Sequence, residues 1–246
     1  MKVTAVYFSP TGGSRRYALA MAQALDKNYD ELDLTPLAEN YPARRFAGGE
    51  LVILAAPVYG GRIPKLAVPR FSVLSSDGAA CILVACYGNR HYDDALAELE
   101  DIAVSHGFTV IGGCAVVGRH TYGAVAVDRP DEDDLRQARA FAVKALKNSR
   151  PFPMPGNRPY RDGGDGGGFY PATGDNCVKC GKCRDLCPAG AIDGSFHVLA
   201  DRCIACFRCV RLCPVGAKQP DSDKYSPFAE KFSAMLSSRR ENEFFI

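Results

Sequence analysis

Short apolar runs alternate with amphipathic stretches along the first 147 residues. Continuous apolar runs cover residues 3–8, 51–56, 81–86 and 108–117, with a weaker run at 29–34. Strands buried on both faces of a parallel sheet have this composition. Between them, residues 13–25, 93–106 and 131–147 carry apolar side chains at helical spacing. Five strands that alternate with helices predict an α/β fold with a doubly wound parallel sheet.

This pattern breaks at residues 148–174, where 27 positions hold five Pro and seven Gly. We interpret this segment as a linker between two domains, which would span about 26–31 Å if it were fully flexible. Residues 175–219 then form a cysteine-rich domain. Residues 220–246 form a C-terminal helix and tail, in which Ser226 and Pro227 are expected as N-cap and first helical residue.

Composition excludes several classes of protein. Of the 246 residues, 47% are hydrophobic and 24% are charged, which is ordinary for a globular chain and excludes global disorder. No stretch approaches the roughly 18 uninterrupted apolar residues of a membrane span. The first apolar run is too short for a secretory signal, so a cytoplasmic protein is expected. A formal net charge of +2 does not predict nucleic-acid binding.

The cysteines carry the most specific signal. Eight of the eleven lie between Cys177 and Cys213, in two copies of the pattern C-x2-C-x2-C-x3-C-P that are offset by 26 residues. In a reducing compartment this usage favours metal or redox chemistry over disulfides. Three thiolates at this spacing suit three corners of a cubane cluster, whose fourth ligand must come from elsewhere. Structural zinc is the alternative, although it usually takes two separated C-x2-C pairs.

This region resembles the bacterial-type ferredoxins with two [4Fe-4S] clusters. In such ferredoxins the last Cys of each run ligates the other cluster. The first cluster is therefore expected on Cys177, Cys180, Cys183 and Cys213, and the second on Cys203, Cys206, Cys209 and Cys187. The other three cysteines (Cys81, Cys86 and Cys114) are expected to be small buried hydrophobes without a redox role.

The loop after the first strand has the composition of a phosphate-binding turn. Hydroxyls of Ser9, Thr11 and Ser14 can donate to phosphate oxygens, while Gly12 and Gly13 let backbone N–H groups approach at a helix N-terminus. The loop is neither a Walker A motif nor G-x-G-x-x-G. Alone, such a turn is equally an ordinary strand-to-helix connection.

Position within the sheet favours the binding interpretation. In a flavodoxin-like sheet of order 2-1-3-4-5, the ligand crevice lies where the first and third strands end. Two more loops end at that edge and offer aromatic rings beside Gly, between which a flat isoalloxazine ring fits. They contribute Pro57, Val58, Tyr59, Gly60 and Gly61 after the third strand, and Tyr87, Gly88, Asn89 and Tyr92 after the fourth. Residues 118–122 are expected to close one side. The Gly60–Gly61 peptide either rotates toward N5 of the reduced flavin or merely turns the chain.

Residues 1–147 resemble a short-chain flavodoxin, in which residues 9–14 match the FMN-phosphate fingerprint. The whole chain resembles the flavodoxin–ferredoxin fusion (EFR-type) proteins of anaerobes. This resemblance implies FMN and two [4Fe-4S] clusters in an electron-transfer protein, with a redox protein as donor or acceptor. The cysteine domain, a small ferredoxin-type α+β fold, carries seven Lys and Arg against four Asp. Free ferredoxins are strongly acidic, so their usual partners do not transfer to this chain.

Two other functions remain open at this point. An FMN-dependent reductase would act on a small substrate, bound through Arg62, Arg90, Arg119 or His120. A redox sensor would change its partner when a cluster is lost, but no DNA-reading motif supports it. For the carrier, we expect the cysteine domain to dock near the Tyr59 and Tyr92 loops, either within its own chain or on a neighbour in a homo-oligomer.

Overall fold

A six-stranded sheet forms the centre of the computed structural model, which describes residues 1–148 and 152–246. Its parallel strands are β1 (Val3–Tyr7), β2 (Asp30–Asp33), β4 (Leu51–Pro57), β6 (Ala80–Tyr87) and β7 (Thr109–Val117). They lie in the order β7-β6-β4-β1-β2, which confirms the predicted flavodoxin-like topology. The sixth strand, β10 (Glu243–Phe245), is antiparallel to β7 and was not predicted.

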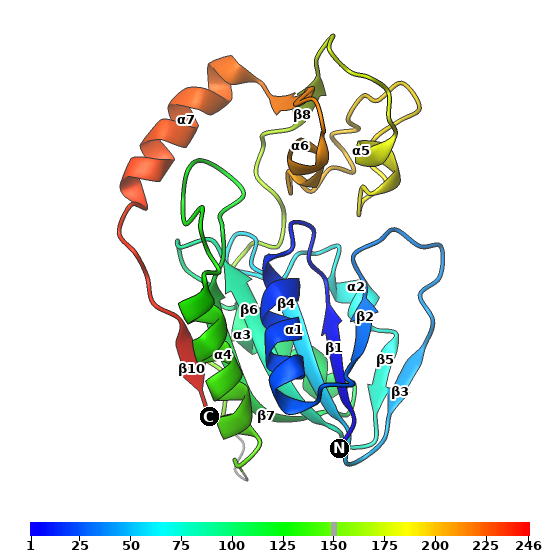
Figure 1. Cartoon of the computed structure of the whole chain (residues 1–246), viewed down its shortest axis with the longest axis vertical. Helices are drawn as coiled ribbons and strands as arrows, with labels where there is room; N and C mark the ends of the chain where they lie inside the picture. Colours follow the sequence, from blue (N-terminus) through cyan, green and yellow to red (C-terminus); the bar gives the residue numbers. More distant parts are fainter. Residues whose placement is uncertain (149–151) are drawn as a thin grey trace.

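Helices cover both faces of this sheet (Figure 1). On one face α1 (Gly13–Leu25) and α4 (Glu132–Ala145) bury Tyr17, Met21 and Phe141 against the strands. On the other face lie α3 (Ala95–Ser105) and the short α2 (Val68–Phe71), which bury Leu96, Leu99 and Phe71. A separate parallel pair, β3 (Arg44–Phe46) with β5 (Leu74–Ser76), flanks this second layer. Burial on both faces explains why the strands are continuously apolar.

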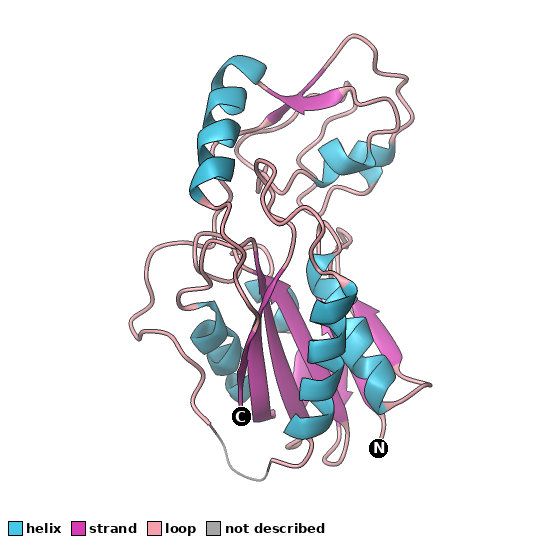
Figure 2. Ribbon diagram, turned by 60° about the vertical axis from the view of Figure 1, so that its left-hand side comes forward, coloured by secondary structure: helices cyan, strands magenta, loops and turns pink. Residues whose placement is uncertain are grey.

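The cysteine domain lies above the carboxyl ends of the parallel strands (Figures 1 and 2). Its first strand, β8 (Pro171–Thr173), pairs antiparallel with β9 (Lys218–Pro220), so its ordered structure begins before the expected residue 175. Between them are two short helices, α5 (Lys182–Asp185) and α6 (Arg208–Leu212). Each follows a residue with positive φ, Gly181 at 81° and Phe207 at 58°.

The described part of the linker is held against the first domain. Asn157 and Arg161 donate backbone hydrogen bonds to the buried carboxylate of Asp94, and Arg158 pairs with Asp101. Further along, the N–H of Gly164 donates to the backbone oxygen of Tyr59, 2.9 Å away. Residues 149–151 of the expected linker lie outside the described residues. The segment 152–164 is thus a fixed strap over α3 and the Tyr59 loop.

The C-terminal segment connects the two domains. Its helix α7 (Ser222–Met235) begins earlier than expected, because Asp221 caps it by accepting from the N–H of Asp223. The expected start at Ser226 and Pro227 is therefore wrong, and Pro227 lies inside the helix. Phe228 and Phe232 stack on each other and pack against Tyr122 and His120, respectively. The chain then descends along the first domain and ends as β10 (Figure 1). Among the described residues, no helix combines the length and apolar character that crossing a membrane requires.

Candidate functional site

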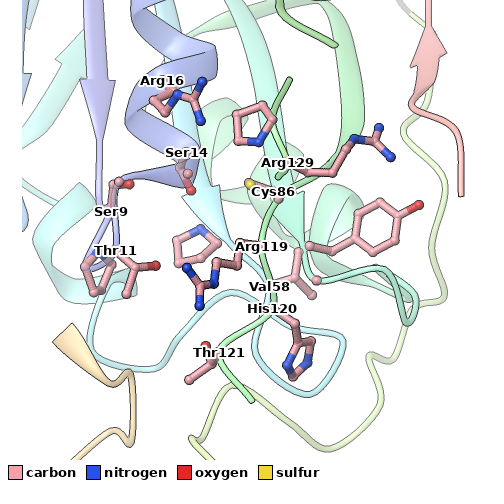
Figure 3. Close-up of a pocket in the computed structure, with 18 of the residues that line it drawn as sticks. Ser9, Thr11, Ser14, Arg16, Val58, Cys86, Arg119, His120, Thr121 and Arg129 are labelled. Carbon is pink, nitrogen blue, oxygen red and sulfur yellow. The ribbon is translucent and has the colours of Figure 1, made fainter. Parts of the chain in front are cut away.

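A cavity of about 330 Å³ opens at the carboxyl edge of the sheet. Loops that follow β1, β4, β6 and β7 surround it (Figure 3). Because β1 and β4 are neighbours whose connections leave in opposite directions, the cavity occupies the switch point where doubly wound folds bind ligands. Ten of the predicted flavin-binding residues line it, namely Ser9, Thr11, Gly12, Gly13, Ser14, Pro57, Val58, Tyr59, Tyr87 and Gly88.

The loop between β1 and α1 presents unpaired donors to this cavity. Gly12 adopts a φ of 89°, which turns the chain into the helix. Among the described residues, the backbone N–H groups of Thr11, Gly13 and Ser14 have no hydrogen-bond partner. The Ser9 hydroxyl accepts from the N–H of Arg15 at 3.0 Å, which fixes the loop and leaves the hydroxyl proton available to donate. Three free N–H groups at a helix N-terminus form an anion site.

The charge around the cavity also suits an anion. Four arginines line it (Arg16, Arg119, Arg129 and Arg211), and its lining includes no carboxylate. Arg129 is fixed by a buried ion pair with Asp134 and by a bond to the backbone oxygen of Arg240. Burial lowers the pKa of His120 to about 4, so this imidazole is neutral at pH 7 and adds no charge.

These observations fit a flavin monophosphate. A terminal phosphate is negatively charged, so the N-terminus of α1 and the arginines attract it, and no carboxylate in the lining repels it. The Ser14 and Tyr87 hydroxyls are buried without a hydrogen-bond partner among the described residues, although buried hydroxyls usually have one. A bound ligand with polar edges can supply such partners. The wall formed by Val58, Tyr59 and Tyr87 offers the apolar surface that a flat ring needs.

Four predicted residues lie outside the cavity lining. Gly60 and Gly61 are the two central residues of a tight turn between Tyr59 and Arg62, with φ angles of 59° and 89°. The carbonyl of Gly61 already accepts from the N–H of Asp94 at 3.0 Å, but the carbonyl of the Gly60–Gly61 peptide belongs to Gly60. This pair forms a turn in the structure, and rotation of its peptide toward N5 of the flavin stays a prediction. Asn89 and Tyr92 instead bind the C-terminal tail, through the backbone oxygen of Ser238 and the carboxylate of Glu243.

Sequence reasoning missed several lining residues. Cys86, assigned no role, lies at the cavity wall between Gly13 and Gly118, where an added Cβ would approach its Sγ to 3.2 Å and 2.7 Å. Burial raises the pKa of its thiol to about 12, so it is protonated there. Arg129 precedes α4 and Arg211 belongs to the other domain, so only tertiary structure brings them to the cavity. The only sequence signal for this basic lining was Arg119 in the loop 118–122 and Arg16 in α1.

The eight cysteines of the repeat surround two further cavities. Cys177, Cys180 and Cys183 line the first together with Cys213, which comes from the second copy of the motif. Cys203, Cys206 and Cys209 line the second together with Cys187 from the first copy. The two cavities are thus lined by the same two sets of cysteines that the sequence predicts, including the one cysteine that each set takes from the other motif. Within the described residues, no three His, Cys, Asp or Glu side chains converge on one metal-ion position. A cubane cluster does not need such convergence, because its four thiolates bind separate iron atoms at its corners.

Three arginines join the cysteine domain to the first domain. Arg208 and Arg211 of α6 donate to the backbone oxygens of Pro10 and His120, both of which line the main cavity. From the other side, the buried Arg70 of α2 donates to the backbone oxygen of Pro188. The domain thus docks beside the phosphate loop and the 118–122 loop. The expected contact near Tyr92 is absent from the described contacts, because Tyr92 faces the tail.

The second set of cysteines is the one beside the main cavity. Burial raises the pKa of Tyr59, and the nearby Cys206 adds to that rise. Tyr122, in the loop that follows β7, donates to the backbone oxygen of Ala205 at 3.4 Å. Cys206 is 7% exposed, whereas Cys180 of the first set is open to solvent. One set therefore faces the cavity and the other faces outward.

Comparison with known proteins supports part of this assignment. Residues 174–193 match the family described as the 4Fe-4S binding domain. A stretch of 57 residues is 39% identical to an uncharacterized protein, MJ0298, of Methanocaldococcus jannaschii. The match covers 21% of this chain and 38% of that relative, so it spans well under half of the relative's length.

Solved structures similar to this chain include flavodoxins. An archaeal flavodoxin is 15% identical with a TM-score of 0.42, covering 60% of this chain and 97% of its own. Flavodoxin 2 of Bacillus cereus, in its oxidised form, is 14% identical with a TM-score of 0.43, covering 60% and 99%. The rubredoxin oxygen:oxidoreductase of Desulfovibrio gigas is 14% identical with a TM-score of 0.40, covering 59% and 36%.

Proposed function

We propose that this chain is an electron-transfer protein that holds one FMN and two [4Fe-4S] clusters. The observation that carries the proposal is the docking of a domain with two four-cysteine cavities against the arginine-rich cavity. Arg211, which lies between Cys209 and Cys213, lines that cavity. The clusters supply one-electron chemistry and FMN supplies one- or two-electron chemistry, so the pair converts between them.

The residues have separate roles in this proposal. Thr11, Gly12, Gly13 and Ser14 bind the phosphate with Arg16, while Val58, Tyr59 and Tyr87 contact the ring. Cys177, Cys180, Cys183 and Cys213 hold the outer cluster, and Cys187, Cys203, Cys206 and Cys209 hold the inner one. The first domain border at 147, a cysteine domain that includes the β8–β9 pair beyond the expected borders of 175 and 219, and membership of the EFR-type fusion group are parts of the same proposal. Eleven unpaired cysteines suit a reducing compartment such as the cytoplasm.

The order of the centres follows from exposure. Cys180 is open to solvent, so a redox protein reaches the outer cluster first. Cys206 is buried, which keeps the inner cluster away from water. Arg208 and Arg211 hold this order by fixing α6 against the cavity wall.

One observation favours a second function. Arg119 lines the cavity and is exposed, and its guanidinium has no hydrogen-bond or ion-pair partner among the described residues. A reductase of a small anionic substrate would use such a guanidinium beside the flavin. In that case the clusters would serve as its internal supply of electrons.

The composition of anaerobically purified protein tests the proposal. We expect about eight iron atoms, eight acid-labile sulfides and one FMN per chain. Stoichiometric zinc without labile sulfide would overturn it. Turnover separates the two functions: a carrier reacts only with redox proteins, whereas a reductase consumes a small organic acceptor. In the second case, Arg119→Ala should raise the KM for that acceptor while leaving the flavin bound.

A further inference from the structure

Lys218 is a fully buried lysine in the cysteine domain. It begins β9, directly after the second cysteine motif, and is 1% exposed. Its Nζ donates to the hydroxyl of Thr173, 2.6 Å away in β8, and to the backbone oxygen of Phe196. Both acceptors are neutral. The ammonium therefore has hydrogen bonds but no opposite charge from these two partners.

Such a lysine needs a counter-charge. A buried ammonium costs several kcal/mol unless an anion lies nearby. Within residues 1–148 and 152–246, no carboxylate forms an ion pair with Lys218. The anions available to it are thiolates, because Lys218 lines the first cysteine cavity together with Cys177, Cys180, Cys183 and Cys213.

We propose that Lys218 is a fixed positive charge beside the [4Fe-4S] cluster of the first cysteine cavity, and that it raises the reduction potential of that cluster. This inference rests on the proposed function. An oxidised cluster with its four thiolates carries a net charge of about −2, and one electron from a donor brings it to about −3. A buried cation stabilises the more negative state more strongly, so reduction becomes easier.

A purely structural role makes a different prediction. Through Thr173 and Phe196, Lys218 also ties β8 to the turn that precedes residue 197. Loss of those bonds alone would lower stability without a systematic change in potential. The reduction potential therefore distinguishes the electrostatic role from the structural one.

The experiment is a redox titration of the intact holoprotein, with dithionite as the one-electron donor, mediators, and electron paramagnetic resonance as the readout. Lys218→Met removes the charge and keeps the apolar stem. We expect the equilibrium constant for reduction of the cluster in the first cavity to fall about tenfold, which corresponds to about 59 mV. The cluster in the second cavity should shift less, since Lys218 does not line that cavity. Lys218→Arg keeps the charge and should restore most of the potential.

Lys182→Met is the matched control. Lys182 lines the same cavity but is exposed, so water and salt screen its charge. We expect less than a threefold change in the same equilibrium constant. Equal shifts for Lys182→Met and Lys218→Met would mean that burial is irrelevant, and would overturn the proposal.

Iron content keeps this test separate from the proposed function. Wild-type protein without about eight irons would contradict the function itself. Lys218→Met protein with full iron and unchanged potentials would overturn only the role of Lys218. If Lys218→Met loses iron, Lys218→Gln, which keeps a donor for Thr173 and Phe196, is titrated in its place. Failure of both to hold clusters would assign Lys218 to assembly, and the tuning role would be discarded.

Discussion

The Arg211 guanidinium donates a hydrogen bond to the backbone oxygen of His120, 2.9 Å away. Arg211 lies in α6 between Cys209 and Cys213, whereas His120 belongs to the loop that closes the main cavity after β7. From the same helix, Arg208 donates to the backbone oxygen of Pro10 in the phosphate loop. The helix that carries Cys209 is therefore bonded directly to two walls of the main cavity.

Removal of these two arginines should separate the domains without emptying them. A hydrogen bond from a charged donor contributes about 1.5–3 kcal/mol, and each 1.4 kcal/mol is a factor of ten in the docking equilibrium. In Arg208→Ala/Arg211→Ala protein, we expect flavin reduction after rapid one-electron reduction of the clusters to slow by at least about tenfold. Stopped-flow absorbance over a dilution series measures this rate.

The matched control is Arg184→Ala/Arg202→Ala. It removes the same charge from the same domain, but both residues are exposed and neither contacts the first domain. Its rate should match wild type and be independent of concentration. A rate proportional to concentration in the wild type would mean that the centres meet only by collision, and the docked arrangement would not be used.

Gly12 offers a test of the phosphate site. An added Cβ at Gly12 meets no atom within 4 Å, but its φ of 89° is unfavourable for any L side chain. Gly12→Val should therefore distort the loop and block its approach to phosphate, and weaken FMN binding at least tenfold while iron content stays constant. Fluorescence titration of the flavin-free protein with FMN measures the affinity.

Gly49→Val supplies a control of equal backbone strain. Gly49 has a φ of 90° and also lacks a neighbour within 4 Å, but it lies before β4, away from the cavity lining. FMN affinity should remain that of the wild type. If both variants lost flavin equally, general destabilisation would account for the effect, and the phosphate assignment would lose its support.

Crossed ligation by Cys213 is tested with double variants. If Cys213 serves the cluster of the first cavity, Cys177→Ala/Cys213→Ala damages one cluster and should retain about four irons. Cys203→Ala/Cys213→Ala would then damage both and retain far fewer. Iron and sulfide analysis of the two proteins decides the matter, because the opposite ranking would place Cys213 with its sequence neighbours.

The parallel strands were predictable because burial on both faces makes each a continuous apolar run. Strand order then placed the phosphate loop and the Tyr59 loop at one edge before any side chain was considered. The two cysteine sets were equally predictable from the sequence, because the size of the cluster, rather than the surrounding fold, fixes the spacing of its ligands.

Other features depend on contacts that no local pattern encodes. Strand β10 has only three residues, so it shows no periodicity, and its position is set by the free edge of β7. Asn89 and Tyr92 lie in a loop whose sequence suggests flavin binding, but their side chains form hydrogen bonds with the C-terminal tail instead. The start of α7 was misplaced because Pro227 suggested a first turn, whereas the Asp221 cap begins the helix five residues earlier.

The tail itself should contribute to stability through Asn242, which is buried just before β10. Its Oδ1 accepts from the N–H of Val117 at 2.9 Å, and its Nδ2 donates to the buried carboxylate of Asp134 at 3.0 Å. Asn242→Ala leaves the buried N–H of Val117 without this acceptor and removes one donor from Asp134, which keeps its ion pair with Arg129, so the free energy of unfolding should fall by about 1–3 kcal/mol. Urea unfolding of the holoprotein, followed by far-UV circular dichroism, should show a lower midpoint with an unchanged slope. Asn28→Ala, at an exposed position after α1, should leave the midpoint in place. An equal effect at both positions would show that the tail is not anchored by Asn242.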